Sequence, residues 1–402
     1  MKKYFVEFFV KFYSNTLMEF RREHQRLTAS QVLQALADGQ DISLLRCTVS
    51  GDLEVDRFFE KEEKFDTSNL QTSAQEQCRI ITFPQKIIMN ECTFEGNVFF
   101  APEWDDEGLL RVVFKQDAVF NMSVFKEQTR FADSTFHGRA GFDGCKFYSV
   151  AAFTDCKFGA QAMFRTVEFH GYALFNRARF AQDARFINTL LSKGGNFKES
   201  LFMSAADFSG VYSTGKSLPT HYDITFARRC SGDGETFWRY VKQAATEAGY
   251  YKLAGDCFYE ERKCNMRGRF YGKNFAKLDK KQKIAKLAKG IKLLPEFLLG
   301  DLLFGYGEKP VRVIYAALTV IITCGLLYFS VGDLECPHSP NGSTFFESMY
   351  FSVITFTTLG FGDVYPNATH TFTRAVAMFE AISGTFLISL FVVCLAKRFS
   401  RG

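Results

Sequence analysis

The sequence predicts a multidomain chain in which a right-handed parallel β-helix precedes a helical linker and an all-α transmembrane module. Three observations predict this fold class. The 402 residues include 47 Phe, many of them at a fixed period. A basic segment has apolar residues at helical spacing. Two apolar runs are about as long, when helical, as the hydrocarbon core of a bilayer is thick. We expect four regions: an N-terminal helical region at 1–41, the β-helix at 42–211, the linker at 212–310 and the transmembrane module at 311–402.

Composition excludes several classes of protein. The net charge of +5 is too small to indicate a nucleic-acid partner. The 11 Cys are scattered without a CxxC pair, which argues against a disulfide scaffold or a zinc finger. We expect no enzymatic activity and no cofactor.

Phe recurs from Phe120 to Phe208 at alternating steps of five and six residues, with Leu191 at one of these positions. A small residue lies two positions before nearly every one of them, as Ala118 and Ala140 do. A helix would place successive Phe on different faces, and a step of five would reverse the side chain in a continuous strand. The chain must therefore turn every five or six residues, so that four short faces form a coil of about 22 residues whose neighbours stack at the strand spacing.

This repeat resembles the pentapeptide-repeat family, in a variant with an alternating sixth residue, over roughly residues 42–211. Residues 42–53 are predicted to form the first coil, residues 101–110 a loop, and residues around 19–36 show helical signals. Cys145 and Cys156 lie one period apart. A metal pair is an alternative there, but packing of buried small residues is favoured. A rod of this kind names no function by itself.

Two apolar runs, Val311–Ser330 and Ala375–Ala396, are long enough to cross a bilayer. Basic residues precede the first run and follow the second, whereas residues 331–373 contain no Lys or Arg. The excess of positive charge on cytoplasmic segments then predicts a multi-pass protein of the cell (plasma or inner) membrane with both termini cytoplasmic. Asn341 and Asn367 begin glycosylation sequons on the outer side.

Between the two runs, Thr344 and Glu347 form a capping box that predicts a short helix over 345–357. The helix leads into Thr357-Thr358-Leu359-Gly360-Phe361-Gly362-Asp363. This segment resembles the filter of two-transmembrane-helix, pore-loop potassium channels, and the resemblance covers about residues 308–398.

The resemblance implies a homotetramer that conducts K⁺ passively. Rings of backbone carbonyl oxygen would replace the hydration of the ion, as described for potassium channels in general. The implied ligands are Thr358, Leu359, Gly360, Phe361 and Gly362, with Thr357 and Asp363 in support. Glycine at alternate positions permits the dihedrals that point adjacent carbonyls inward.

Two residues depart from the commoner pattern of that family: Phe361 replaces Tyr and Leu359 replaces Val. Two other functions therefore stay open, a non-selective cation channel and a membrane-tethered scaffold with a vestigial pore. The sequence has no arginine-rich apolar span of the kind that serves as a voltage sensor, so voltage gating of that kind is not expected.

In the second run, Arg374, Glu380 and Gly384 match a spacing found in many prokaryotic inner helices. Gly384 is either a gating hinge or a site of close helix packing. A carboxyl group within the bilayer needs a partner or a proton, so we expect Glu380 to hydrogen-bond to Ser352 or Thr355 behind the short helix.

The linker contains a helical pattern over 236–261 and a basic run from Lys280 to Lys292 with an apolar stripe at helical spacing. This run fits either a membrane-surface helix that contacts anionic lipid or a solvated helix. For the β-helix we expect a role in regulation or assembly, with an unknown cytoplasmic partner as one possibility.

Overall fold

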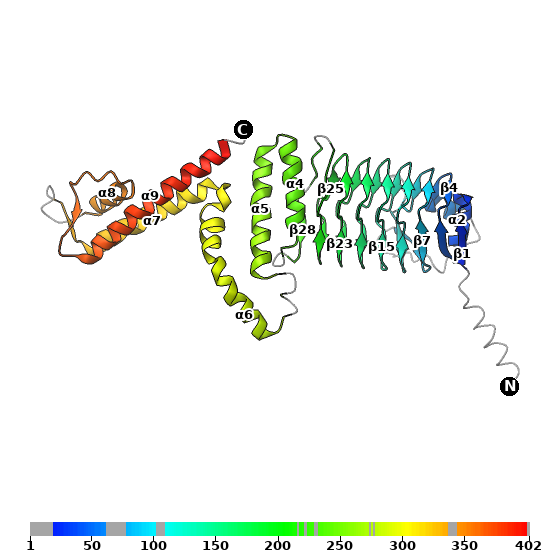
Figure 1. The fold of residues 1–402 in the computed structure, drawn as a ribbon, viewed down its shortest axis with the longest axis horizontal. Helices are drawn as coiled ribbons and strands as arrows, with labels where there is room; N and C mark the ends of the chain where they lie inside the picture. The colour runs from blue at the N-terminus through cyan, green and yellow to red at the C-terminus, as the bar shows by residue number, and fades with distance from the viewer. Residues whose placement is uncertain are drawn as a thin grey trace. The chain divides into compact units, whose positions relative to one another are not determined.

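The computed structural model describes residues 19–61, 78–101, 109–214, 217–220, 223–228, 232–272, 275, 278–336 and 344–399. The chain divides into two compact units, Met1–Lys277 and Leu278–Gly402 (Figure 1). Each unit is described by itself.

The first unit contains a rod of four parallel sheets, in which each coil adds at most one short strand to each sheet. The first sheet is β1 (Glu19–Glu23), β3 (Asp41–Leu45), β7 (Ile87–Asn90), β11 (Ala118–Val119), β15 (Ala140–Gly141), β19 (Ala162–Met163), β23 (Ala184–Arg185) and β27 (Ala206–Asp207). The second is β6 (Cys78–Phe83), β10 (Leu109–Phe114), β14 (Thr135–Phe136), β18 (Lys157–Phe158), β22 (Arg179–Phe180), β26 (Leu201–Phe202) and β28 (Thr225–Phe226). The third is β2 (Arg26–Thr28), β4 (Thr48–Ser50), β8 (Thr93–Phe94), β12 (Val124–Phe125), β16 (Lys146–Phe147), β20 (Glu168–Phe169) and β24 (Leu190–Leu191). The fourth is β5 (Leu53–Glu54), β9 (Val98–Phe99), β13 (Thr129–Arg130), β17 (Ala151–Ala152), β21 (Ala173–Leu174) and β25 (Gly195–Asn196).

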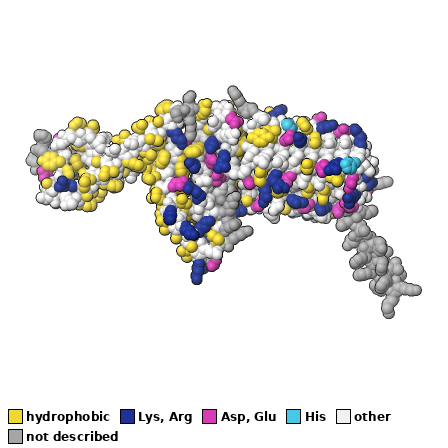
Figure 2. Space-filling view, viewed as in Figure 1, with side chains coloured by type: hydrophobic (Ala, Val, Ile, Leu, Met, Phe, Trp, Pro, Cys, Tyr) yellow, Lys and Arg dark blue, Asp and Glu magenta, His cyan; other side chains and the backbone are white. Residues whose placement is uncertain are grey.

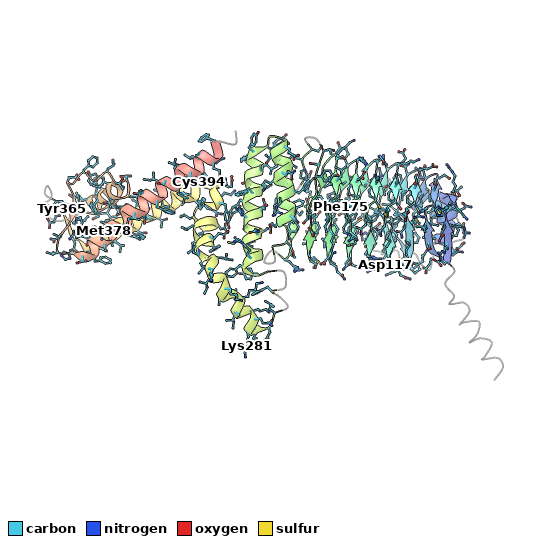
Figure 3. The ribbon with its side chains drawn as sticks, viewed as in Figure 1. Asp117, Phe175, Lys281, Tyr365, Met378 and Cys394 are labelled. Carbon is cyan, nitrogen blue, oxygen red and sulfur yellow. The ribbon has the colours of Figure 1, made fainter. Side chains whose placement is uncertain are left out.

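The register of these strands confirms the predicted repeat and the β-helix. Phe136 lies opposite Phe158, and Phe158 opposite Phe180, at intervals of 22 residues. The Phe rings fill the interior as continuous stacks: Phe164 stacks on Phe142 at 5.1 Å and on Phe186 at 4.9 Å between ring centroids. Phe175 lies inside the rod and Asp117 at its surface (Figure 3). The abundance of Phe is thus largely a packing device, because every coil needs the same ring at the same place.

Cys145 and Cys156 do not stack on each other, although a period of eleven would make them neighbours. A full coil has 22 residues, so Cys145 lies just before β16 of the third sheet and Cys156 just before β18 of the second. Both thiols are buried and behave as packing groups. Cys145 Sγ donates to Phe120 O and Cys156 Sγ donates to Phe131 O, each at 2.9 Å. Burial raises the pKa of both thiols, so they stay protonated. Within the described ranges no cluster of three His, Cys, Asp or Glu side chains could hold a metal ion.

The prediction of a helical N-terminal region was wrong for residues 19–28. β1 and β2 occupy them, and β1 pairs in parallel with β3, so the rod begins before residue 42. Among the described residues from 19 to 41, the helical segment is α2 (Ala29–Ala37), and it starts at a capping box between Thr28 and Gln31. Pairing with the next coil satisfies the backbone of both strands and overrides the local helical signal. A further helix, α3 (Val55–Lys61), follows β5, and most of the predicted loop at 101–110 lies outside the described residues.

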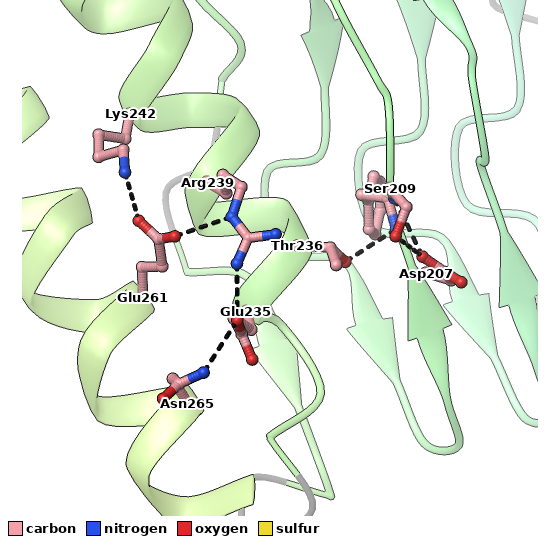
Figure 4. Close-up of polar contacts among 9 residues, drawn as sticks. Asp207, Ser209, Glu235, Thr236, Arg239, Lys242, Glu261 and Asn265 are labelled. Atoms are coloured by element: carbon pink, nitrogen blue, oxygen red, sulfur yellow. Dashed lines mark hydrogen bonds and ion pairs between the residues drawn. The ribbon is translucent and has the colours of Figure 1, made fainter.

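The last coil is covered by α4 (Glu235–Glu247) and α5 (Tyr251–Phe270), which belong to the first unit. Phe237 packs at 5.7 Å from Phe197 and 5.0 Å from Phe208, closing the aromatic stack. Glu261 joins the two helices by accepting from Arg239 Nε at 2.9 Å and Lys242 Nζ at 2.6 Å (Figure 4). Burial alone would raise the pKa of Glu261, but these two hydrogen bonds outweigh it and lower the pKa. The helices thereby protect this end of the sheets from pairing with other chains.

Replacement of one interior ring should destabilise the rod strongly. In Phe164→Ala we expect the free energy of unfolding of the first unit to fall by about 3–5 kcal/mol, because the substitution opens a cavity between two stacked neighbours. The urea midpoint of the full chain, followed by circular dichroism, measures this loss. Tyr172→Ala is the control, since Tyr172 is 53% exposed. Equal midpoints for the two variants would contradict the importance of the stacked rings.

The second unit is all-helical apart from one small two-stranded sheet. Its elements are α6 (Lys280–Gly290), η4 (Ile291–Leu293), η5 (Glu296–Leu303), η6 (Gly305–Gly307), α7 (Pro310–Val331), β29 (Leu334–Glu335), α8 (Phe345–Phe356), β30 (Tyr365–Pro366) and α9 (Thr371–Phe399). In the part of the chain that the structure describes, α7 and α9 are the two helices long and apolar enough to cross a membrane. Hydrophobic side chains cover much of their visible surface (Figure 2).

Candidate functional site

The short helix α8 is held at both ends. Glu347 Oε2 accepts from Thr344 N at 2.7 Å and Thr344 Oγ1 accepts from Glu347 N at 3.3 Å, which completes the predicted capping box. At its other end, the chain passes directly into residues 357–363, the segment that the sequence predicts to be a filter, which is called the filter loop below. The C-terminal end of a helix carries partial negative charge, so α8 makes the start of this loop favourable for a cation.

Backbone dihedrals alternate along the filter loop. Thr358 has φ 58°, Gly360 has φ 54° and Gly362 has φ 79°, whereas Leu359 and Phe361 between them do not have positive φ. Alternation of left- and right-handed residues is what directs successive carbonyl groups to one side of an extended chain. The sequence predicted this conformation for the two glycines. It did not predict that Thr358 adopts it too, against the steric preference of a β-branched residue.

The beginning of the filter loop is fixed to the last turn of α8. Thr358 N donates to Thr355 O at 3.1 Å, Leu359 N donates to Ile354 O at 3.0 Å, and Thr357 Oγ1 donates to Val353 O at 2.7 Å. The side chains of Leu359 and Phe361 are 62% and 67% exposed. The start of the loop is therefore anchored to α8, while Leu359 and Phe361 are open to the surroundings of the single chain.

The outer end of the filter loop is tied back to α8. Tyr350 Oη donates to Asp363 Oδ2 at 2.8 Å, across 13 residues. Sequence reasoning proposed a supporting role for Asp363 but did not identify its partner.

Tyr350→Phe removes this tie and little else. This hydrogen bond is exposed to solvent, so its contribution to the stability of the fold is small. If residues 357–363 act as the predicted filter, the variant should conduct when first opened, and its sustained ion current should decay several-fold faster than that of the wild type. Single-channel recording measures the decay, with Tyr315→Phe as control because Tyr315 is 66% exposed on α7. Unchanged decay in Tyr350→Phe would contradict a supporting role for this contact.

Behind the filter loop, the fully buried Glu380 connects all three helices of the module. Its Oε1 accepts from Ser352 Oγ of α8, and its Oε2 accepts from Tyr328 Oη of α7 at 2.7 Å. The predicted contact with Ser352 is therefore present. Tyr328 was missed, because nothing in the spacing of α7 distinguishes it from other apolar positions.

Gly384 lies one turn further along α9, where the helix touches the end of α8. A Cβ built on Gly384 would overlap with the carbonyl oxygen of Phe356, the last residue of α8. α9 runs unbroken from Thr371 to Phe399. Of the two predicted roles, this close approach supports close helix packing.

The other end of α9 is bound to the turn before α7. Lys397 Nζ donates to Tyr306 O at 2.7 Å and lies 2.9 Å from Glu308 Oε1. Next to it, Arg312 Nη1 donates to Asp301 O at 2.6 Å. This second anchoring point was not predicted, since its members are 91 residues apart in sequence.

Comparison with known families supports the assignment of both parts. Residues 315–401 match a family model described as ion channel. The chain carries an ion-channel domain. Residues 90–146 match a model of pentapeptide repeats, in nine copies, which agrees with the rod. No curated protein and no solved structure matched the chain.

The match to the channel domain spans most of α7, all of α8 and α9, and the loop between them. The predicted site residues from Thr357 to Asp363 form one continuous loop, and Glu380 and Gly384 lie on the helix behind it. The chain is therefore a membrane protein whose channel domain has two apolar helices around a short, capped one.

Proposed function

We propose that this protein is a potassium-selective channel that conducts K⁺ passively, and not an enzyme. The observation that carries the proposal is the alternation of positive φ at Thr358, Gly360 and Gly362. The loop starts at the C-terminal end of a capped helix too short to cross the membrane. Carbonyl groups of Thr358, Leu359, Gly360 and Phe361, together with the Thr358 hydroxyl, would replace the hydration shell of K⁺.

The channel would be a homotetramer. One loop supplies a quarter of a ring of oxygen atoms, and closed symmetry with four copies completes each ring. Lys309 and Arg312 lie at the start of the first span, and Lys397 and Arg398 follow the second. Two spans bring both basic groups to the same side of the membrane, which favours insertion into the cell membrane with both termini in the cytoplasm. The rod would then be a cytoplasmic domain that regulates or localises the channel through an unknown partner.

Potassium flux from liposomes tests conduction. Purified full-length protein should release K⁺ down its gradient, and a membrane-tethered scaffold should not. A non-selective cation channel is the second alternative. The apolar Phe361 argues against it, because non-selective relatives typically have a polar residue at that position.

The segment before the membrane would contact anionic lipid. α6, η4 and η5 form a nearly continuous helical run that ends shortly before α7 begins at Pro310. Six apolar side chains on one side of this run are exposed: Ile284, Leu287, Ile291, Leu294, Leu298 and Leu302. The lysines lie on the rest of its circumference: Lys281, Lys283, Lys286, Lys289 and Lys292. This pattern suits a helix that lies at the membrane surface, with its apolar side toward the acyl chains and its lysines near phosphate groups.

Removal of four of these charges should weaken binding to anionic lipid. Each lysine near a negative surface contributes about 1 kcal/mol. With Lys283, Lys286, Lys289 and Lys292 all changed to Gln, the loss sums to about 4 kcal/mol, so we expect up to about a thousandfold loss of affinity for micelles containing anionic lipid. The same change at four rod lysines (Lys126, Lys146, Lys157 and Lys198) is the control. Equal affinities for both variants would favour the solvated-helix alternative.

A further inference from the structure

Three segments of the channel domain meet at Asp333, just beyond the end of α7. Its backbone oxygen accepts from Asn367 N at 3.0 Å. Its Oδ2 lies 2.9 Å from His370 Nδ1 and 3.5 Å from Thr373 Oγ1, at the beginning of α9. The side chain of Asp333 is 19% exposed, and that of His370 is 50% exposed. The carboxylate is therefore largely withdrawn from water, whereas the imidazole is open to the solution.

This junction is directly connected to the outer end of the filter loop. β30 begins at Tyr365, two residues after Asp363, and pairs antiparallel with β29, which follows Asp333. Pro366 lies opposite Leu334, and Tyr365 opposite Glu335. His370 N also donates to Asn367 O at 3.1 Å. The strand that leaves the filter is thus held between the end of α7 and the start of α9, with Asp333 at the centre.

The pair of His370 and Asp333 can change strength with pH. A neutral imidazole with its proton on Nδ1 donates a hydrogen bond in which only the carboxylate is charged, whereas an imidazolium adds a positive charge and forms a hydrogen-bonded ion pair. Other titratable or charged groups on the surrounding elements are Glu335, Cys336, Glu347, Tyr350, Asp363, Tyr365 and Arg374. Carboxylic acids, thiols, phenols and guanidinium groups ordinarily titrate outside pH 5.5–7.5, and histidine is the side chain that ordinarily titrates within it.

We propose that His370 and Asp333 form a proton-sensitive clamp on the filter exit, which tightens when the outer solution is acidified. Protonation of His370 would strengthen its contact with Asp333 and so hold β30, and with it Asp363, in the conformation seen here. This inference rests on the proposed conduction function and adds a regulatory site to it. Sustained potassium current should therefore rise as outer pH falls from 7.5 to 5.5.

The test is sustained current through the full-length channel in planar bilayers, with pH changed on one side at a time. For the wild type we expect an increase of about fivefold at outer pH 5.5, as an ion pair replaces a hydrogen bond in which only Asp333 is charged, and no such response to inner pH. His370→Gln keeps a donor that cannot gain a proton, so it should conduct at pH 7.5 without the outer response. Asp333→Asn removes the charge on the other partner and should also lose the response.

His338→Gln is the matched control, because His338 is the other histidine between the two spans, outside the described residues. It should keep the wild-type response. The clamp is overturned if His370→Gln still responds, if His338→Gln does not, or if the wild type conducts with no response to outer pH. Absence of current from the wild type at every pH would instead overturn the proposed function on which the clamp depends.

Discussion

Gly360→Val should abolish potassium flux. Gly360 has φ 54°, a conformation that costs an ordinary L-residue about 1–2 kcal/mol and a β-branched one at least as much. In a tetramer the cost is incurred four times around one ring, so conduction should fall by at least about 100-fold. Flux from liposomes with equal amounts of reconstituted protein measures the loss.

Gly249→Val is the matched control for this substitution. Gly249 also has positive φ, 80°, and at neither glycine does another side chain or backbone segment come within 4 Å of the position that a Cβ would occupy. It lies between α4 and α5 in the first unit, so its strain does not reach the filter loop. If the two variants conducted equally well, residues 357–363 would not be the conducting element, and the scaffold alternative would gain support.

Gly384→Ala should have the second-largest effect, by separating α9 from the end of α8. The added methyl group meets the carbonyl oxygen of Phe356, which is backbone and cannot rotate away. Overpacking of this kind costs about 1–3 kcal/mol per subunit. We expect a lower thermal midpoint for the channel domain, together with reduced flux, because Phe356 immediately precedes the filter loop.

The same variant separates the two predicted roles of Gly384. Alanine is a better helix former than glycine by about 1 kcal/mol, so a residue that serves only as a hinge should give an unchanged or higher midpoint with impaired opening. Close packing predicts the opposite sign for the midpoint. Ser383→Ala, at the adjacent position, controls for a change of side chain on α9 without the clash.

The repeat could be predicted in detail because it is regular. One Phe per face, at steps of five and six residues, fits a parallel β-helix and neither an α-helix nor a continuous strand. The register of Phe136 with Phe158 agrees with the β-helix. The prediction was wrong at residues 19–28, where the sequence lacks the Phe repeat and only pairing with the next coil makes a strand. Local patterns do not report such long-range pairing.

The positive φ of Gly360 and Gly362 could also be predicted from the sequence, because glycine at alternate positions indicates a backbone that other residues adopt only at a cost. The contacts that hold the loop were only partly accessible. Ser352 was one of two residues on the short helix expected to contact Glu380. Tyr328 and Lys397 were not predicted, because they bind partners 52 and 91 residues away in the sequence. Residues of this type have many possible partners, and only the folded chain selects one.

The reversal potential of the wild-type channel tests the central claim most directly. A planar bilayer would separate solutions with a tenfold difference in potassium, with sodium added to equalise the total cation concentration. A potassium-selective filter predicts reversal near the potassium equilibrium potential, about 59 mV from zero for a monovalent ion. Reversal at zero would contradict selectivity and identify the pore as a non-selective cation channel.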